Sequence, residues 1–483
     1  MNTTLKTYRI LVAALTCAAL STFAQESLDR SVRPQSQPVP KVRLPEFQKA
    51  TLSNGLNIWM VEDHSLPLAA MNLVIQAGSD HDPLDKPGIA SMAAEVLDEG
   101  TTTRNALQIS DELDFIGANM NVRSTFDGTF LSLNTLTKHM DKALDVYLDV
   151  LTNATFPEKE FVRLKEQRLT SLLQQKDRPG TIANLSFNYI IYGVQHPYGN
   201  DPSGSEQSIS SMTRDDLVSF YQTYYRPNNA TLIVVGDVTL KDIATRLERG
   251  LASWKSTTIP AFQHRPASSV EKRSVYLIDK PGAAQSEIRI GYPAVARNSP
   301  DFFPITIMNR VLGGQFTSRL NLNLREKRGF SYGVRSAFQF NKYPGPFVAS
   351  GGVTTAKTDS SLQEFMYEIG KMYREGVTAD ELQFVKKSLT GSFALGFETP
   401  AQIAGAIQNV VLYSLPENYY QTYLENIERV ALDQVQRVAT KYLDTSKMAV
   451  VIVGDLKVIK DGIEKLQLGE TVLCDVNGHK LTQ

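Results

Sequence analysis

A strand pattern that ends in Gly-Asp occurs twice in this chain, and no other feature constrains the fold as much. Residues 230–238 are Ala-Thr-Leu-Ile-Val-Val-Gly-Asp-Val, and residues 448–456 are Met-Ala-Val-Val-Ile-Val-Gly-Asp-Leu. Each aliphatic run predicts a buried strand, and each follows a helix that ends in tyrosine, at Tyr225 and at Tyr442. Because the two copies close two segments of domain size, they predict two similar α+β domains in tandem.

A chain of 483 residues is too long for one ordinary core. We place the domains at residues 44–252 and 275–470. The segment between them, residues 253–274, contains Pro260, Pro266 and several serines and threonines, which favours a linker. The remaining segments are a signal peptide at 1–24, a disordered lead-in at 25–43 and a tail at 471–483.

The first 24 residues have the pattern of a secretory signal peptide. Lys6 and Arg9 are positive, residues 10–20 are apolar, and Thr22 and Ala24 are small residues at the positions that a signal peptidase recognises. A membrane anchor is the alternative, but the apolar run is far shorter than the roughly 20 residues that span a bilayer. The pattern predicts export to the periplasm of a Gram-negative bacterium, with no membrane span after cleavage.

Cysteine usage and net charge bear on how the protein is anchored, whether it has disulfides and which partners it binds. Cys17 raises the alternative of a lipid anchor, but residues 14–16, Ala-Leu-Thr, form a poor lipobox. Cys474 is the only other cysteine, so a cleaved chain has no internal disulfide, and a domain of this size needs none. The net charge of -1 and the pI of about 6.6 favour neither nucleic acid nor an anionic membrane as a partner.

Several motifs follow one another in a specific order. Residues 88–101, Gly-Ile-Ala-Ser-Met-Ala-Ala-Glu-Val-Leu-Asp-Glu-Gly-Thr, have apolar positions at helical spacing. Further along the chain are His-Pro-Tyr-Gly at 196–199, Tyr-Tyr-Arg-Pro-Asn at 224–228, Gly-Gly-Gln-Phe-Thr-Ser-Arg-Leu at 313–320 and Leu-Arg-Glu-Lys-Arg-Gly-Phe-Ser-Tyr at 324–332. In this succession, from about residue 47 to about residue 466, the chain resembles the pitrilysin/insulinase family of zinc metallopeptidases, which includes the mitochondrial processing peptidases.

The resemblance implies an architecture as well as an activity. Each domain is expected to be an α+β fold in which helices cover a largely antiparallel sheet. Two such double-domain chains would close like a clamshell around a chamber. An extended peptide substrate would add to a sheet edge inside it.

The family's metal-binding motif is missing. Active members carry His-x-x-Glu-His on the first of these helices, where two histidines bind zinc and the glutamate activates the metal-bound water. The corresponding positions here are Ser91, Ala94 and Glu95, and the third ligand, a glutamate in active members, falls near Ser171. We expect Ser91 and Glu95 to lie on a solvated helix face, and this chain to hold no zinc of its own.

The histidines elsewhere in the chain do not supply a replacement zinc site. None of the six, at positions 64, 81, 139, 196, 264 and 479, forms an i, i+4 pair with another. An unorthodox metalloenzyme that uses Glu95 is disfavoured, because one carboxylate without partners holds zinc weakly.

A second constellation is retained. Arg325 and Tyr332 match an arginine–tyrosine pair of the family's C-terminal domain, and the resemblance implies a substrate clamp that faces the zinc. A guanidinium can donate paired hydrogen bonds to a peptide carbonyl, and a phenol can donate to a developing oxyanion. The alternative is structural, with Arg325 in a surface ion pair and Tyr332 packed on a strand.

Together these features predict a non-catalytic, substrate-clamping subunit that is inactive alone. Its partner would be a relative with an intact His-x-x-Glu-His motif and the zinc, and the pair would act on extended peptides. The alternative is a peptide-binding or scaffold protein of the same fold without a proteolytic role. The retained Arg325 and Tyr332 argue mildly against that alternative.

Overall fold

The computed structural model of the protein describes residues 46–261, 266–267 and 270–481, and these belong to one compact unit. The predicted signal peptide with Cys17, the lead-in and part of the linker lie outside the described residues.

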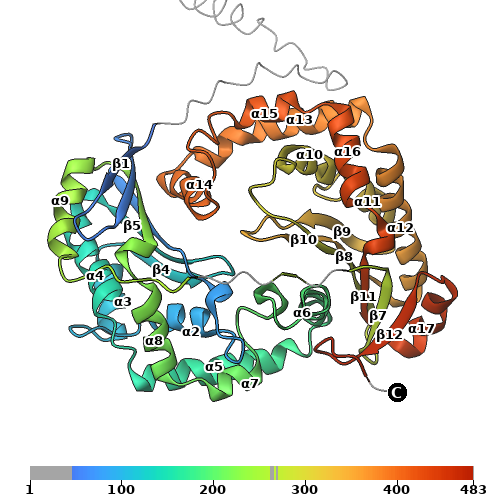
Figure 1. The fold of residues 1–483 in the computed structure, drawn as a ribbon, viewed down its shortest axis with the longest axis horizontal. Coiled ribbons are helices and arrows are strands. Elements are labelled where there is room, and N and C mark those ends of the chain that lie inside the picture. Colours follow the sequence, from blue (N-terminus) through green and yellow to red (C-terminus); the bar gives the residue numbers. More distant parts are fainter. Residues whose placement is uncertain (1–45, 262–265, 268–269, 482–483) are drawn as a thin grey trace, which may run out of the picture. The chain divides into compact units, whose positions relative to one another are not determined.

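Six strands of the first half form a mixed sheet (Figure 1). Their order is β1-β2-β6-β3-β5-β4, and every neighbouring pair is antiparallel except β2 and β6. The strands are Gln48–Thr51 (β1), Asn57–Glu62 (β2), Leu68–Ile75 (β3), Asn119–Ser124 (β4), Thr129–Leu136 (β5) and Ala230–Gly236 (β6).

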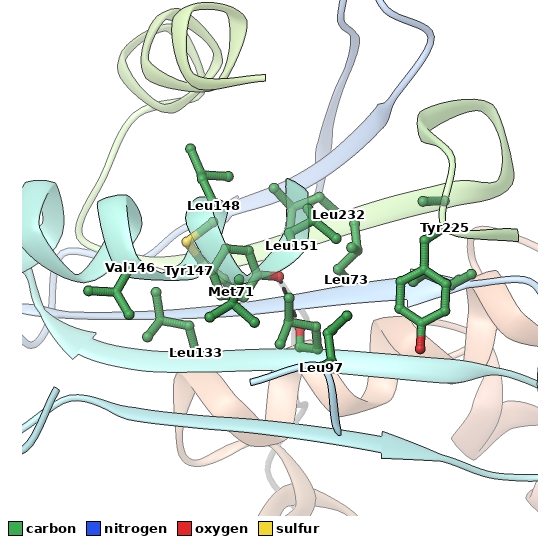
Figure 2. Close-up of a cluster of buried hydrophobic side chains, with 14 of the residues drawn as sticks. Met71, Leu73, Leu97, Leu133, Val146, Tyr147, Leu148, Leu151, Tyr225 and Leu232 are labelled. Carbon is green, nitrogen blue, oxygen red and sulfur yellow. Dashed lines mark hydrogen bonds between the residues drawn. The ribbon is translucent and has the colours of Figure 1, made fainter. Parts of the chain in front are cut away.

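Helices cover one face of this sheet and bury its alternate side chains. In Figure 2, Met71 of β3, Leu133 of β5 and Leu232 of β6 face Tyr147 and Leu151 of α4. The helices of this half are Ile89–Val96 (α2), Ala106–Phe115 (α3), Met140–Asn153 (α4), Glu158–Gln175 (α5), Pro179–Tyr192 (α6), Glu206–Ser211 (α7), Arg214–Tyr224 (α8) and Leu240–Gly250 (α9).

The second half repeats this plan. Its sheet has the order β12-β7-β11-β8-β10-β9, with β7 parallel to β11 and β12 and the other pairs antiparallel. The strands are Ser274–Asp279 (β7), Gln285–Val295 (β8), Ser331–Phe338 (β9), Gly345–Thr354 (β10), Ala449–Gly454 (β11) and Glu470–Cys474 (β12). Strand β12 begins where we placed the end of the second domain, so the sheet continues into the segment predicted as a tail.

The helices of the second half cover its sheet in the same way. They form a core around Ile288, Phe347 and Ile452, separate from the core of the first half. The helices are Phe302–Leu312 (α10), Arg319–Asn321 (α11), Thr358–Glu375 (α12), Ala379–Phe393 (α13), Pro400–Leu412 (α14), Tyr423–Arg429 (α15), Leu432–Tyr442 (α16) and Leu456–Lys465 (α17).

The repeated Gly-Asp strands occupy equivalent places. β6 lies parallel to β2 and antiparallel to β3, and β11 lies parallel to β7 and antiparallel to β8. Gly236 ends β6 with a φ of +143°, and a Cβ there would come within 2.1 Å of the Leu68 carbonyl oxygen, so only glycine fits. The predicted pair of tandem α+β domains with largely antiparallel sheets is therefore confirmed, with one parallel strand pair in the first sheet and two in the second.

The two halves exchange one helix each. α6, from the first half, packs on β8 and β11 of the second sheet, where Ile182 and Phe187 meet Val451. α14, from the second half, packs on β3 and β6 of the first sheet, where Ile407 meets Ile233. Each sheet is therefore buried by its own helices on one face and by a helix of the other half on the opposite face. Of the helices described, none is both long and apolar enough to cross a lipid bilayer.

Candidate functional site

Helix α2 carries the positions of the missing metal ligands. It begins after Gly88, whose φ of +99° suits glycine, and Asp82 accepts hydrogen bonds from the backbone N–H groups of Gly88 and Ala90 at 2.6 and 2.9 Å. Burial raises the pKa of Asp82 to about 8, although these two bonds oppose the shift.

Ala94 is buried in the core, whereas Ser91 and Glu95 lie one turn apart on the helix face that the core leaves free.

An arginine from α5 lies against this face of α2. Arg168 forms an ion pair with Glu95, and its Nη2 donates to the Ser91 hydroxyl at 3.3 Å. Its Nη1 donates to the Ser203 carbonyl at 2.9 Å. The Arg168 side chain is only 13% exposed and that of Glu95 38%. The Glu95 side chain is thus partly solvated, as expected of this face, but it has a partner distant in sequence that the helix pattern does not predict.

The residues present do not fit zinc. Ala94 has no ligating atom, the Ser91 hydroxyl is a poor ligand, and a permanently protonated guanidinium contacts the one carboxylate. Ser171, at the expected third-ligand position, is exposed on α5 one turn beyond Arg168. Among the described residues, no group of three or more His, Cys, Asp or Glu side chains could hold a metal ion.

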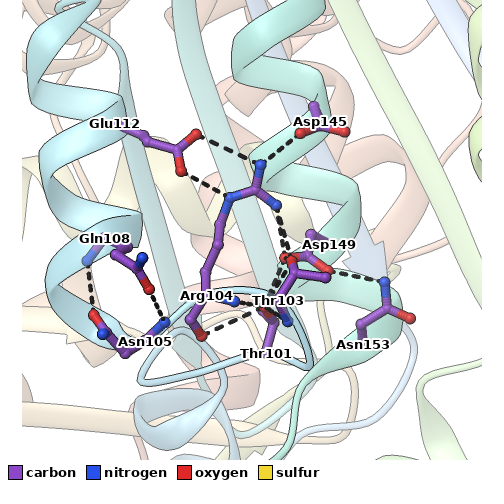
Figure 3. Close-up of polar contacts among 9 residues, drawn as sticks. All are labelled: Thr101, Thr103, Arg104, Asn105, Gln108, Glu112, Asp145, Asp149 and Asn153. Carbon is purple, nitrogen blue, oxygen red and sulfur yellow. Dashed lines mark hydrogen bonds and ion pairs between the residues drawn. The ribbon is translucent and has the colours of Figure 1, made fainter.

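A partly buried ion-pair network holds the segment that follows α2 (Figure 3). Arg104 donates to Asp149 at 2.8 Å, to Asp145 at 2.6 Å and to Glu112 at 3.1 Å. Burial would raise the pKa of Asp149, but hydrogen bonds from Thr101 and other neighbours outweigh it and lower the pKa. The network ties this segment to α3 and α4.

The predicted clamp residues lie at the start of the edge strand β9. Arg325 is on a π-helical turn, Leu322–Lys327 (η5), and its guanidinium lies over the Phe316 ring, 4.6 Å from the centroid. It also contacts Glu326 at 3.4 Å. Tyr332 is 89% exposed, so it does not pack on a strand. Within the described residues, no hydrogen bond or ring contact joins Arg325 to Tyr332.

Buried polar contacts hold the η5 turn in place. Arg319 forms two hydrogen bonds with Glu381 of α13, at 2.8 and 2.6 Å. Asn323 donates at 2.8 Å to both Glu364 and Glu368 of α12. Because the turn is tied to two helices of the core, the Arg325 backbone is pre-positioned while its side chain remains 38% exposed.

Both candidate regions lie next to the open edge of a sheet. β9 ends the second sheet and carries Tyr332, and β4, which packs near α2, ends the first. An edge strand presents backbone N–H and C=O groups that can pair with an extended peptide.

A set of hydrogen bonds between the two halves, here called the latch, was not predicted from the sequence; it consists of the contacts that Tyr198, Asp127 and Tyr192 make with residues 342–344. Tyr198, in the His-Pro-Tyr-Gly motif, donates its hydroxyl to Asp127 of the β4–β5 turn and accepts from the Tyr343 N–H at 3.2 Å. Asp127 also accepts from the Lys342 N–H at 2.9 Å, and the Tyr192 hydroxyl donates to the Pro344 carbonyl at 2.8 Å. The first half thus binds the β9–β10 turn of the second, and hence the far end of the strand that carries Tyr332.

A pocket of about 570 Å³ lies elsewhere in the unit, between α5, α6, α7 and the chain around His479. Its lining includes Leu172, Lys176 and Glu206 but none of the four positions of the lost metal ligands. The pocket and the degenerate metal site are separate features.

Two tandem α+β domains, with a peptidase-type helix that lacks its metal ligands, define a metallopeptidase-like protein. The chain belongs to the insulinase family. The family profile described as "Insulinase (Peptidase family M16)" matches residues 58–186, and the profile described as "Peptidase M16 inactive domain" matches residues 211–389. The family resemblance drawn from the motifs is confirmed.

Relatives carry names of both active and inactive kinds. The "Uncharacterized zinc protease YmxG" of Bacillus subtilis is 26% identical over 393 residues, which are 80% of this chain and 94% of that protein. The "Non-peptidase homolog YmxG" of Helicobacter pylori is 26% identical over 402 residues, 82% of this chain and 91% of that protein. A solved "peptidase M16 inactive domain" from Pseudomonas fluorescens is 27% identical, with a TM-score of 0.80, over 85% of this chain and 98% of that one.

Proposed function

We propose that this chain is the non-catalytic, substrate-clamping subunit of an exported zinc peptidase made of two different chains. The observation that carries the proposal is that the chain lacks the metal-binding residues but keeps the two residues of the predicted clamp. The α2 positions hold no set of zinc ligands, and Arg168 contacts Ser91 and Glu95 there, whereas Tyr332 is exposed at an open sheet edge that follows Arg325 in the chain. In this role the partner, a relative with an intact His-x-x-Glu-His motif, supplies the zinc and the activated water.

The clamp has a defined chemical task. An extended peptide would pair with an edge strand through its backbone, which places its carbonyl groups at fixed positions. The Arg325 guanidinium can donate to such a carbonyl, and the Tyr332 hydroxyl can donate to an oxyanion as it develops. Their exposure and the rigid support of η5 suit groups that meet a substrate from another chain's site.

Mixing experiments test the proposal. The purified chain is expected to bind no stoichiometric zinc and to cleave no peptide, and mixing with a zinc-bearing relative is expected to give activity that neither chain has alone. Elemental analysis that finds one tight zinc per chain contradicts the first expectation. A relative that is fully active alone, and that this chain leaves unchanged, removes the subunit role.

The clamp itself is tested by Tyr332→Phe and Arg325→Ala in the mixed complex. Loss of one donor aimed at developing charge typically lowers turnover by about 10²–10³. Lys327→Ala is the control, because Lys327 is an exposed cation on the same turn. Steady-state kinetics on a quenched peptide give turnover, and size-exclusion chromatography confirms that the complex persists.

The alternative is a peptide-binding or scaffold protein of the same fold, a role in keeping with a relative named a non-peptidase homologue. Wild-type turnover in both clamp variants, with the complex intact, favours this alternative.

A further inference from the structure

The Arg168 side chain lies at the positions of the lost metal ligands, and arginine is not a metal ligand. Arg168 contacts the residues at both histidine positions, through the ion pair with Glu95 and the 3.3 Å hydrogen bond to Ser91. A guanidinium has five N–H donors, no acceptor and a permanent charge, so it can pair with a carboxylate but cannot ligate zinc.

The guanidinium is held from a third side. Its bond to the Ser203 carbonyl ties it to the loop before α7. That loop is fixed against the start of α2, since a Cβ on Gly88 would come within 2.8 Å of the Gly204 Cα. Leu164 and Leu172 are buried on either side of Arg168 along α5. The arginine therefore joins α2, α5 and the 201–205 loop, as a bound metal would join its ligands.

We propose that Arg168 braces α2 against α5 in the place where active relatives hold zinc, and that it excludes zinc even when the ligands are restored. Arg168 and position 171 are one turn apart on the same face of α5. A glutamate restored at Ser171 would therefore lie within reach of the guanidinium, which would pair with it and repel the metal. This inference does not depend on the clamp or on any partner chain.

Zinc binding by restored chains tests the exclusion. The first variant carries Ser91→His, Ala94→Glu, Glu95→His and Ser171→Glu, and the second adds Arg168→Met. Zinc per chain is measured across a chelator-buffered series, with circular dichroism to confirm folding. The second variant is expected to bind about one zinc, and to bind it about 10–100-fold more tightly than the first, the range that neighbouring side chains typically give. Equal affinities overturn the exclusion, and so does the absence of binding in both folded variants.

A second arm in the otherwise unchanged chain tests the brace and remains informative if the restored chains do not fold. Arg168→Met is expected to lower the thermal unfolding midpoint by several degrees. The matched control is Arg163→Met. Arg163 lies on the same helix and forms ion pairs with Glu99 and Glu160, but its side chain is 42% exposed, so these pairs contribute little to stability. Glu95→Gln is expected to lower the unfolding midpoint much less in the Arg168→Met chain than in the wild-type chain, because Arg168, the partner of Glu95, is already absent. Additive losses, or equal effects of the two arginine variants, overturn the brace.

Discussion

Removal of one hydroxyl group, by Tyr198→Phe, is expected to weaken the latch between the two halves. The Tyr198 side chain is 1% exposed. The change leaves the buried Asp127 with one donor fewer and the Tyr343 N–H without its acceptor. A hydrogen bond to a charged group contributes about 1.5–3 kcal/mol, and a buried polar group left unsatisfied costs about 1–3 kcal/mol. The expected loss in the free energy of unfolding is therefore about 2.5–6 kcal/mol, measured by urea denaturation.

The loss has a predictable pH dependence. Burial raises the pKa of Asp127, and the hydrogen bond from Tyr198 opposes that shift. Without the hydroxyl, the folded-state pKa rises further. A raised folded-state pKa means that stability falls as the pH increases from the unfolded value near 3.9 through the folded value. The cost of Tyr198→Phe is therefore larger at pH 7 than at the acid end of the range in which the protein stays folded.

Two further variants make the test specific. Tyr189→Phe removes a phenol from a half-buried ring of α6 and is expected to change stability by less than about 0.5 kcal/mol. Asp127→Asn in the Tyr198→Phe chain is expected to recover part of the loss, because the buried charge is gone. If Tyr198→Phe is as stable as Tyr189→Phe at neutral pH, the latch does not couple the halves.

Three other predictions concern stability and are checked by urea denaturation. Arg104→Met is expected to cost about 3–5 kcal/mol, because it leaves the buried carboxylate of Asp149 without its cation; a loss below about 1 kcal/mol contradicts a structural role. Burial would raise the pKa of Asp301, but hydrogen bonds from Arg437 and its neighbours lower it well below its usual range. The advantage of wild type over Asp301→Asn is therefore expected above about pH 4 and is lost as the pH falls further, and a constant difference refutes it. Tyr332→Phe is expected to leave stability within about 0.5 kcal/mol of wild type, because the ring is exposed; a larger loss means that the hydroxyl has a structural partner.

Local patterns were sufficient for the elements that carry the family signature. The aliphatic runs at β6 and β11 predicted central strands, because a strand buried on both faces needs apolar residues throughout. The apolar spacing of residues 89–97 predicted α2, and the absence of histidines there predicted a degenerate metal site. The ordered motifs alone identified the family.

The partners of the site residues depended on tertiary contacts. Arg168 is 73 residues from Glu95. Residue type does not distinguish it from Arg163, the other arginine of α5, although its place one turn from the lost third ligand was a usable signal. Asp127 is 71 residues from Tyr198 and 215 from Lys342, so the latch exists only when both sheets are formed. The exchange of α6 and α14 was equally hidden, since an apolar helix face does not specify which sheet it covers.

The sequence by itself determined the two-domain α+β plan, the family and the loss of the zinc ligands, because these follow from residue type and spacing along the chain. Only the tertiary structure decided that an arginine covers the vacated ligand positions, that Tyr332 is exposed at a sheet edge, and that Tyr198 joins the halves. The physical reason is that hydrogen bonds, ion pairs and burial depend on distances in space, which the chain fixes only when segments far apart in sequence pack together.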